Sequence, residues 1–370
     1  METYATKITG LARLIRSCKK PIIFTGAGLS TNAGIPDYRS GMDTTVKTGP
    51  GIWNYKDDDS FWDRVLESRK RTLLATPSYS HMAIAKLIEE GLVEHLISQN
   101  VDGLHVKSRV PLSKLTELHG NVFSESCQKC GSVYYRNFRT RIQEDRTHDT
   151  GKTCDNAACG GDLHDTLVLF GESIPRSKLE LSLYKAYHSE LCVCIGSSLL
   201  VKPAVSFPML VKKRGKLAIL NMDPTPLDKI SDVTIHDNCD TIMKSLMDEL
   251  GITVPDYIQE NRIDILKGDD SLEVIPQDLN HRKIKHVELL IYDEKSDMTT
   301  EKLPYRFKFS SETSQCQLRL HFKTGSKTPL EIDFEISQLS HGLNPVICKF
   351  TPSHHPKSPS PRPWTEIKFQ

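Results

Sequence analysis

Several features that would assign this chain of 370 residues to a specialised class are missing from its sequence. The N-terminus has no continuous apolar run and no small-residue cleavage site, which argues against a secretory signal. Lys and Arg total 48 and Asp and Glu 47, so the net charge of +1 offers no general attraction to nucleic acid or anionic membranes. No internal repeat is present, and a hydrophobic content of 38% argues against wholesale disorder. We therefore expect a soluble globular protein of a reducing, intracellular compartment, with no membrane partner.

What the sequence does contain is an alternation of short apolar runs and helical segments, from Pro21 to about Pro255. The runs PIIFTG, LVEHLISQN, ELCVCIGSS and KLAILNMD each have the length of a buried strand. This alternation predicts an α/β fold, a Rossmann-like parallel sheet with helices on both faces. Thr76 before Pro77 predicts the start of the helix that carries Leu87.

Two stretches break this rhythm. Residues 123–164 are polar, rich in arginine and contain paired cysteines, which predicts a small module inserted into the α/β domain. Beyond Gly268, alternating apolar residues such as Tyr305, Phe307 and Phe309 predict antiparallel strands with one buried face. The expected boundaries are a catalytic α/β domain at 1–260, a linker at 261–284, a β-rich C-terminal extension at 285–350 and a flexible Pro/Ser-rich tail at 351–370.

Four of the ten cysteines form two close pairs, Cys127-x2-Cys130 and Cys154-x4-Cys159. In a long intracellular chain such pairs favour a metal site over disulfides. Four thiolates complete the tetrahedral shell of zinc (Zn²⁺) and leave no position for water, so the zinc would be structural. His148 and His164 lie nearby but are not needed as ligands. Unrelated free thiols are the alternative, and the wider spacing of the second pair leaves the geometry of the pairing open.

The segment GAGLSTNAGIPDYRS, residues 26–40, directly follows the first apolar run. Gly26 and Gly28 allow a tight turn from strand to helix, in which backbone N–H groups face a pyrophosphate. Thr31 stands where the dehydrogenase fingerprint has a third glycine, and no obvious ribose-binding acid stands at the end of a second strand. A glycine turn that merely packs a helix on the sheet is the alternative to a nucleotide site.

Three further polar segments follow, SQNVDG at 98–103, ELHGN at 117–121 and GSS at 196–198. The first and third come directly after apolar runs, at the carboxyl edge of the sheet, where open α/β folds bind ligands. His119 lies in the second segment. A lone histidine is more often structural, but its near-neutral pKa suits a general base where several polar segments converge.

In this order and spacing, GAGLSTNAGIPDYRS, SQNVDGLH, ELHGN, GSSL and NMDPT resemble the motif set of the sirtuins, over roughly residues 5–255. The forms SQNVDGLHVKS, ELHGNVF and DTLVLFGE are most similar to the branch that contains sirtuin six and sirtuin seven. The resemblance implies an NAD-dependent protein-lysine deacylase that consumes NAD as a co-substrate. Its substrate would be an acyl-lysine protein, with histone as a candidate.

The resemblance also implies a role for each matching residue. His119 would be the catalytic base that deprotonates a ribose hydroxyl, with Asn100 and Asp102 holding the nicotinamide end of the cofactor. The residues implied to line NAD are Gly26, Ala27, Gly28, Ser30, Asp37, Tyr38, Arg39, Gln99, Asn100, Asp102, Gly196, Ser197, Ser198, Asn221 and Cys239.

Phe170, Gly171 and Glu172 match the family segment whose backbone pairs with the substrate peptide as an added strand. Phe170, with Ile35 and Tyr38, is also a candidate for shielding the reaction from water, and core packing is the alternative for its ring. Residues 40–52 are longer than the corresponding loop of the branch, so the preferred acyl group stays open.

Other functions are compatible with parts of this pattern. A protein mono-ADP-ribosyltransferase would use the same NAD, and a hydride-transferring dehydrogenase would reduce it. A catalytically quiet NAD-responsive scaffold would use the β-rich extension to bind an unknown protein. The intact His119, Asn100 and Asp102 argue against the scaffold.

Branch resemblance implies a nuclear location, with the cytoplasm as the alternative. A basic cluster on the inserted module is a candidate contact to chromatin, although the interruption by Glu144 and Asp145 favours an ordinary solvated face. The cluster consists of Arg136, Arg139, Arg141 and Arg146.

Overall fold

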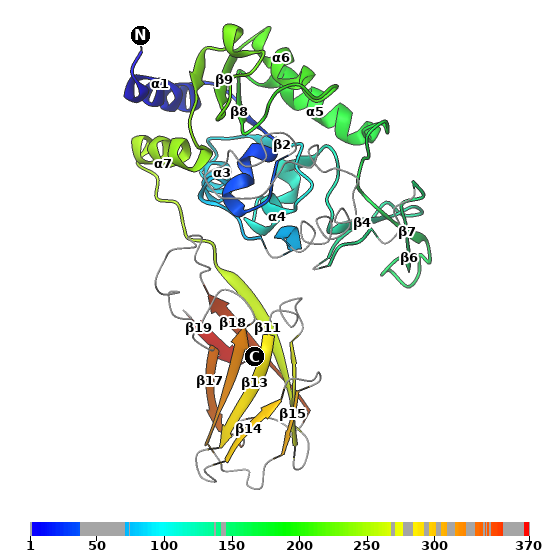
Figure 1. Cartoon of the computed structure of the whole chain (residues 1–370). Coiled ribbons are helices and arrows are strands. Elements are labelled where there is room, and N and C mark those ends of the chain that lie inside the picture. Colours follow the sequence, from blue (N-terminus) through cyan, green and yellow to red (C-terminus); the bar gives the residue numbers. More distant parts are fainter. Residues whose placement is uncertain are drawn as a thin grey trace, which may run out of the picture. The chain divides into compact units, whose positions relative to one another are not determined.

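The structure is a computed structural model that describes residues 2–37, 71–73, 75–136, 138–141 and 146–267, and beyond them the strands given below with residues 337 and 339. The chain forms two compact units, Met1–Asp256 and Tyr257–Gln370, coloured along the sequence in Figure 1. Tyr38, Arg39 and the 40–52 loop lie outside the described residues.

The first unit is built on a six-stranded sheet in which neighbouring strands run parallel. In spatial order its strands are β10 (Val233–Ile235), β9 (Lys216–Leu220), β8 (Leu191–Ile195), β1 (Ile22–Thr25), β2 (His95–Ser98) and β3 (Leu115–Glu117). The chain winds from β1 to β3 on one side and from β8 to β10 on the other. Its winding therefore reverses between β1 and β8, as in a Rossmann-like sheet, and the predicted fold class is confirmed.

Helices cover both faces of this sheet. The helices α1 (Tyr4–Ser17), α3 (Tyr79–Glu89) and α7 (Cys239–Leu250) pack on one face, and α5 (Arg176–His188) and α6 (Ser206–Lys212) pack on the other. Strand residues alternate between the two cores, since Ile23 and Val193 join the first and Phe24 and Cys194 the second. Because both faces are buried, β1, β8 and β9 are almost continuous apolar runs, which made them predictable, whereas the three-residue strands β3 and β10 were not among the predicted runs.

Helix α3 begins later than predicted. It starts at Tyr79 with Ser78 as its N-cap, so the expected start at Thr76 and Pro77 is wrong by two residues. The carboxylate of Asp240, from α7, accepts the Ser80 N–H at 2.9 Å. The first turn is therefore satisfied by a local capping box of Ser78 and His81 and by a side chain far away in sequence, and the local pattern cannot reveal the second contact.

The predicted insertion is a separate antiparallel sheet of four strands between β3 and α5, in the order β5-β4-β7-β6. Its strands are β4 (Ser124–Cys127), β5 (Val133–Tyr135), β6 (Asp149–Thr153) and β7 (Asp162–Asp165). The buried residues of its core are Cys127, Cys154 and Leu163. So small a core buries little apolar surface, which is typical of modules that depend on a metal.

The second unit contains two antiparallel sheets, with strand orders β15-β12-β11-β18-β19 and β14-β13-β16-β17. The strands are β11 (Gln259–Lys267), β12 (Ser271–Pro276), β13 (Ile284–Ile291), β14 (Ser296–Thr300), β15 (Tyr305–Lys308), β16 (Gln315–Phe322), β17 (Leu330–Glu335), β18 (Gly342–Phe350) and β19 (Glu366–Phe369). Tyr305 and Phe307 are both buried, so β15 has the predicted single buried face.

Two of the expected boundaries need correction. The segment 261–284, expected as a linker, contains most of β11 and all of β12. Ile265, Leu272 and Val274 are buried there, so the apolar alternation begins earlier than the charged residues between them suggest. In the expected tail, β19 pairs with β18, and a strand of four residues is too short to stand out in a Pro/Ser-rich stretch.

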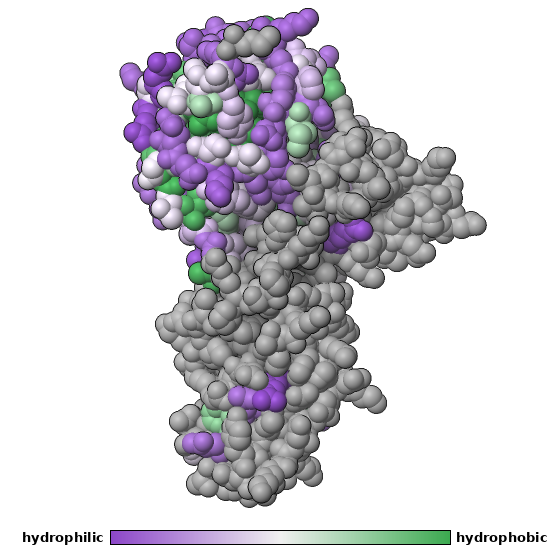
Figure 2. Space-filling model, turned by 60° about the vertical axis from the view of Figure 1, so that its left-hand side comes forward, coloured by the Kyte–Doolittle hydropathy of each residue, from purple (hydrophilic) through white to green (hydrophobic). Residues whose placement is uncertain are grey.

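No helix among the described residues has the length and apolar character needed to cross a membrane. On the face shown in Figure 2, hydrophilic residues, in purple, separate small groups of hydrophobic ones, in green. Among the residues coloured there, no broad apolar surface stands out.

Candidate functional site

The loops after β1 and β8 touch at the carboxyl edge of the parallel sheet. The Gly26 N–H donates to Ile195 O at 3.1 Å, and the Gly28 N–H donates to Gly196 O at 2.8 Å. An added Cβ would lie 2.8 Å from Gly196 O at Gly26 and 2.9 Å from it at Gly28, so only glycine permits this approach. The contact falls where the winding of the sheet reverses, the usual ligand site of such folds.

A chain of buried polar groups runs along this edge. The Asn100 side chain donates to Gly26 O at 3.0 Å and to Ser30 Oγ at 3.2 Å. Ser30 Oγ donates to Asp102 Oδ2 at 2.7 Å, and Asp102 Oδ1 accepts the Leu104 N–H at 2.9 Å. A buried carboxylate is costly unless donors surround it, and here each oxygen has one. The loop after β2 is thereby fixed to the glycine-rich loop.

His119 is joined to the same edge through Gln99. The Gln99 side chain donates to Ser197 Oγ at 2.9 Å, and its backbone O accepts from His119 Nδ1 at 3.0 Å. This bond places the ring proton on Nδ1 and leaves the lone pair of Nε2 available. Burial lowers the pKa of His119 below 6.5, although the carbonyl acts in the opposite direction. The neutral ring, which can accept a proton, is therefore the form present at pH 7.

The structure thus brings together most of the residues expected to line NAD. The group that meets at the edge consists of Gly26, Ala27, Gly28, Ser30, Gln99, Asn100, Asp102, Gly196, Ser197 and, next to it, Ser198. Cys239 lies close by, with its Sγ 4.0 Å from Gly28 O, and burial raises the pKa of this thiol to about 12. It is a packing group there, not a nucleophile.

Other expected residues are less closely joined. Asp37 is half-buried at the end of the described glycine-rich segment. Asn221 follows β9, and its side chain donates to Asp223 O at 2.8 Å, within its own loop. Tyr38 and Arg39 belong to the stretch that the structure leaves undescribed.

Two buried groups next to the site escaped the sequence-based selection. His105 Nε2 lies 3.0 Å from Thr25 Oγ1 at the end of β1, and burial lowers the pKa of His105 to about 3. Glu117 accepts from Asn121 Nδ2 at 2.7 Å, and burial raises its pKa to about 7. Both residues lie inside the quoted motifs SQNVDGLH and ELHGN, which is the signal that could have identified them.

The four predicted zinc ligands form one cluster in the inserted module. All four Sγ atoms lie within 4.8 Å of one another, with Cys127 and Cys159 3.6 Å apart and Cys130 and Cys154 3.7 Å apart. Thiolates that share a zinc ion at about 2.3 Å are about 3.8 Å apart in a tetrahedron. The Lys129 N–H donates to Cys127 Sγ at 3.4 Å, which favours a thiolate. These residues fit Zn²⁺, and the wider spacing of the second pair does not prevent the arrangement.

The expected substrate segment forms a turn between β7 and α5. The Glu172 N–H donates to Leu169 O at 3.0 Å, and Gly171 has a φ of 85°, which favours glycine. Phe170 is 66% exposed, which rules out core packing for its ring. The Val168 N–H donates to His119 O at 2.9 Å, so this segment lies directly beside the proposed base.

The glycine-rich loop lies at the reversal point of a parallel α/β sheet, where such folds bind nucleotides. With a neutral histidine beside this loop and an inserted four-cysteine module, the first unit belongs to the class of nucleotide-binding domains that contain zinc. Residues 26–203 match the Sir2 family. The chain is 32% identical over 267 residues to NAD-dependent protein deacetylase Sirt6 of Drosophila melanogaster, an alignment that covers 69% of this chain and 79% of that protein. The chain therefore belongs to the Sir2 family, the sirtuins, as its motifs predicted.

Further relatives agree with this assignment. NAD-dependent protein deacetylase SRT1 of Arabidopsis thaliana is 36% identical over 263 residues, covering 70% of this chain and 52% of that protein, so the chain spans about half its length. The solved structure of a Sir2 homolog–NAD complex is 27% identical with a TM-score of 0.52, covering 65% of this chain and 93% of that one. Sir2 bound to acetylated peptide is 29% identical with a TM-score of 0.51, covering 66% and 99%.

Proposed function

We propose that Met1–Asp256 is an NAD-dependent protein-lysine deacylase that transfers the acyl group of a lysine to ADP-ribose and releases nicotinamide. The observation that carries the proposal is His119, a neutral base fixed through Gln99 to the nucleotide edge and through Val168 to the segment beside it. The names of the similar proteins, and the NAD and acetylated peptide in the similar solved structures, support it.

When bound, NAD would supply an electrophilic ribose carbon with nicotinamide as its leaving group. The close contact of Gly26 and Gly28 with Gly196 brings backbone to the place where the pyrophosphate would lie. Asn100 and Asp102, fixed by Ser30, would orient the nicotinamide end. This arrangement lets the protein position the reacting groups instead of reacting covalently itself.

The part of His119 in this reaction is a proton transfer. Its Nε2 would accept the proton of a ribose hydroxyl, while Nδ1–H stays bound to Gln99 O, which stabilises the imidazolium that forms. Exposed Phe170 and the half-buried Ile35 are suited to exclude water. The zinc site has four protein ligands and offers no open position, so its part is structural.

The finer substrate and location are proposed on branch resemblance alone: histone as substrate, association with chromatin, and residence in the nucleus. The basic cluster of the inserted module gives them little support. Arg136 is ion-paired with Glu125 at 2.6 Å and with Asp155 at 2.7 Å, and Arg141 is buried against Asp165 at 3.1 Å. A chromatin contact would therefore use residues other than these two arginines, or the β-rich second unit. Binding of another protein is also proposed for that unit.

Product analysis tests the proposed reaction. We expect the protein, incubated with NAD and a panel of acyl-lysine peptides, to give nicotinamide, free lysine peptide and O-acyl-ADP-ribose in equal amounts by mass spectrometry. ADP-ribose attached to protein, without deacylation, would indicate a transferase. A near-ultraviolet absorbance from reduced nicotinamide would indicate a dehydrogenase. A folded, zinc-loaded protein that forms no product with any peptide would support the scaffold.

The contact between the two loops gives a second test, the substitution Gly196→Ala. Gly196 has a φ of 62°, and an added Cβ would lie 2.2 Å from Leu29 N, so the loops must separate. We expect a loss of about 1–3 kcal/mol in unfolding free energy and at least tenfold weaker NAD binding by calorimetry. The matched control is Gly91→Ala, which has a φ of 73° but no atom within 4 Å of the new Cβ. Equal NAD affinity in the two variants would contradict this role of Gly196.

A further inference from the structure

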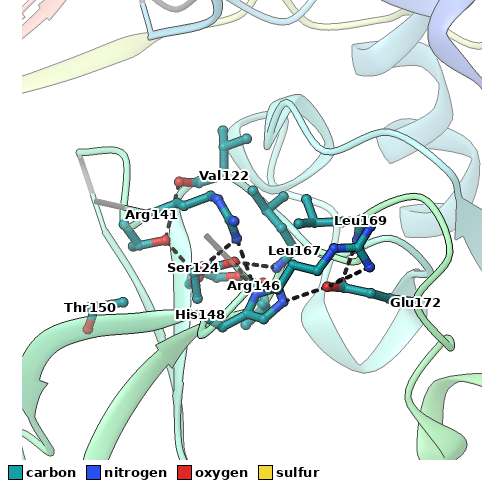
Figure 3. Close-up of polar contacts among 12 residues, drawn as sticks. Val122, Ser124, Arg141, Arg146, His148, Thr150, Leu167, Leu169 and Glu172 are labelled. Atoms are coloured by element: carbon teal, nitrogen blue, oxygen red, sulfur yellow. Dashed lines mark hydrogen bonds and ion pairs between the residues drawn. The ribbon is translucent and has the colours of Figure 1, made fainter. Parts of the chain in front are cut away.

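His148 lies between two carboxylates that come from different segments. Its Nδ1 is 3.1 Å from Asp165 Oδ1, and its Nε2 is 3.1 Å from Glu172 Oε1 (Figure 3). A neutral imidazole has a single N–H, which would leave one ring nitrogen's lone pair facing a carboxylate oxygen. The two carboxylates therefore favour an imidazolium that donates to both, while Arg141 Nη1, 3.3 Å from Nδ1, acts in the opposite direction. The ring joins the inserted module to the turn at 169–172.

The charges around the ring support this form. Glu172 and Asp165 face it from two segments, while Arg141 Nη1, which donates to Asp165 Oδ2 at 3.1 Å, lies 3.3 Å from His148 Nδ1. Although partial burial acts in the opposite direction, the hydrogen bonds to Asp165 and Glu172 raise the pKa of His148 above 6.5. These hydrogen bonds thus keep the ring protonated to a higher pH than in a free histidine, in spite of the neighbouring guanidinium.

The turn is held at several points. Glu172 Oε2 accepts the Leu169 N–H at 2.8 Å, and Arg146 Nη2 donates to Phe170 O at 3.0 Å. The Arg146 side chain is 65% exposed and lies 3.9 Å from Glu172 Oε1, so this ion pair contributes little. The His148 side chain is only 19% exposed, and its bonds are correspondingly less screened by water.

The backbone of His148 is fixed as well. Its φ of 59° is a left-handed conformation that residues other than glycine seldom adopt. Its carbonyl accepts the Asp165 N–H at 2.8 Å, next to the side-chain bond between the same two residues. The surrounding contacts therefore stabilise an unfavourable conformation that aims the ring at Glu172.

The segment that leads into the turn packs against the loop of His119 in the proposed active site. An added Cβ at Gly120 would lie 1.8 Å from Thr166 O, so the segment before the turn packs directly on the loop of His119. The Val168 N–H bond to His119 O continues this contact. A shift of the turn would therefore move the backbone that lies beside the base.

We propose that His148 is a positioning residue for the acyl-lysine peptide, because as an imidazolium it fastens the turn at 169–172 to the inserted module. The turn is the segment proposed to pair with the peptide, so this inference rests on the proposed function. Loss of the ring's charge releases Glu172 and loosens the segment. The affinity for the peptide therefore depends on pH through His148. The affinity for NAD, which the loops after β1 and β8 would bind, does not depend on His148.

The test compares His148→Ala with the matched variant His164→Ala. His164 lies on β7 of the same module, and no hydrogen bond joins its side chain to 166–172 within the described residues. For His148→Ala we expect faster hydrogen exchange at the Leu169 and Glu172 amides and about tenfold weaker binding of an acetyl-lysine peptide by fluorescence anisotropy at pH 6.5. The KM for NAD should stay unchanged, and His164→Ala should match the wild type in all three measurements.

The pH profile separates positioning from general packing. Since the pKa of His148 is raised in the folded protein, its contribution is complete below about pH 6.5 and is lost as the pH rises through the raised value. As the pH rises through the pKa of His148, the peptide affinity of the wild type should fall. The peptide affinity of His148→Ala should not show this fall. Glu117, with a pKa of about 7, titrates in the same range, but its effect is common to both proteins.

The outcomes are distinct. Exchange at Leu169 and Glu172 that is unchanged in His148→Ala would overturn the inference, whatever the peptide data show. A wild type that neither binds nor deacylates any peptide would refute the proposed function, while the exchange measurement would still show whether His148 holds the turn. If His148→Ala does not fold, His148→Gln keeps one N–H donor and should show intermediate exchange at the same amides.

Discussion

Replacing His119 with alanine should lower kcat for deacylation by roughly 10²- to 10⁴-fold, the usual contribution of a positioned general base. The variant keeps Gln99, Asn100 and Asp102, so NAD should still bind with an affinity within a few-fold of the wild type. Mass spectrometry of O-acyl-ADP-ribose and calorimetric titration with NAD measure the two effects separately. The matched control is His188→Ala on α5, an exposed histidine whose Nδ1 also bonds a backbone carbonyl, Tyr184 O, at 2.8 Å.

The pH dependence of the wild type gives the same assignment without a variant. Burial lowers the pKa of His119 below 6.5, so the ring is a neutral base at and above neutral pH and becomes protonated as the pH falls through its pKa. We therefore expect kcat to be full near pH 7 and to decrease on the acidic side of 6.5. A His119→Ala enzyme that keeps a tenth of wild-type kcat, or keeps this acidic limb, would show that another group is the base.

Much of the first unit could be predicted from sequence because its strands are buried on both faces. Runs such as IIFT and LCVCI contain no polar residue on either face except Thr25 at the strand end, so they are recognisable without an alignment. The resemblance implied that Ser30, Asn100 and Asp102 line one cofactor, and the three side chains do meet, because loops after parallel strands share one edge of the sheet. Both successes rest on the regular geometry of parallel strands.

What could not be predicted depends on contacts between distant residues. At the start of α3, the local capping box of Ser78 and His81 is joined by Asp240, which lies 160 positions from Ser80. Likewise, His148 was identified only as a neighbour of the zinc ligands, since no local pattern shows that its ring faces Glu172, 24 positions away. The charged residues of β11 concealed a strand with Ile265 buried in it. Such cases need the tertiary structure.

Removing the metal should unfold the inserted module while the parallel sheet stays folded. Apart from Cys127 and Cys154, Leu163 is the buried hydrophobic residue of its core, with Tyr134 and Cys159 partly buried beside it. Structural zinc sites contribute roughly 10–16 kcal/mol in small modules, far more than this core can supply. In the variant Cys154→Ser, or after chelation, we expect the bound zinc, measured by atomic absorption, and the protection of amides in β4 to β7 to be lost.

Deacylation should fail together with the module. The turn at 169–172 is held by His148 and Arg146, which lie in the module, so we expect at least a 100-fold loss of kcat/KM for the peptide. NAD affinity should change little, because the contact between Gly28 and Gly196 involves no residue of the module. The control Cys18→Ser removes a half-buried thiol outside the cluster and should keep zinc and activity. A zinc-free protein that retains amide protection in β4 to β7 would show that the module folds without its metal, and the dependence of the peptide segment on zinc would then be wrong.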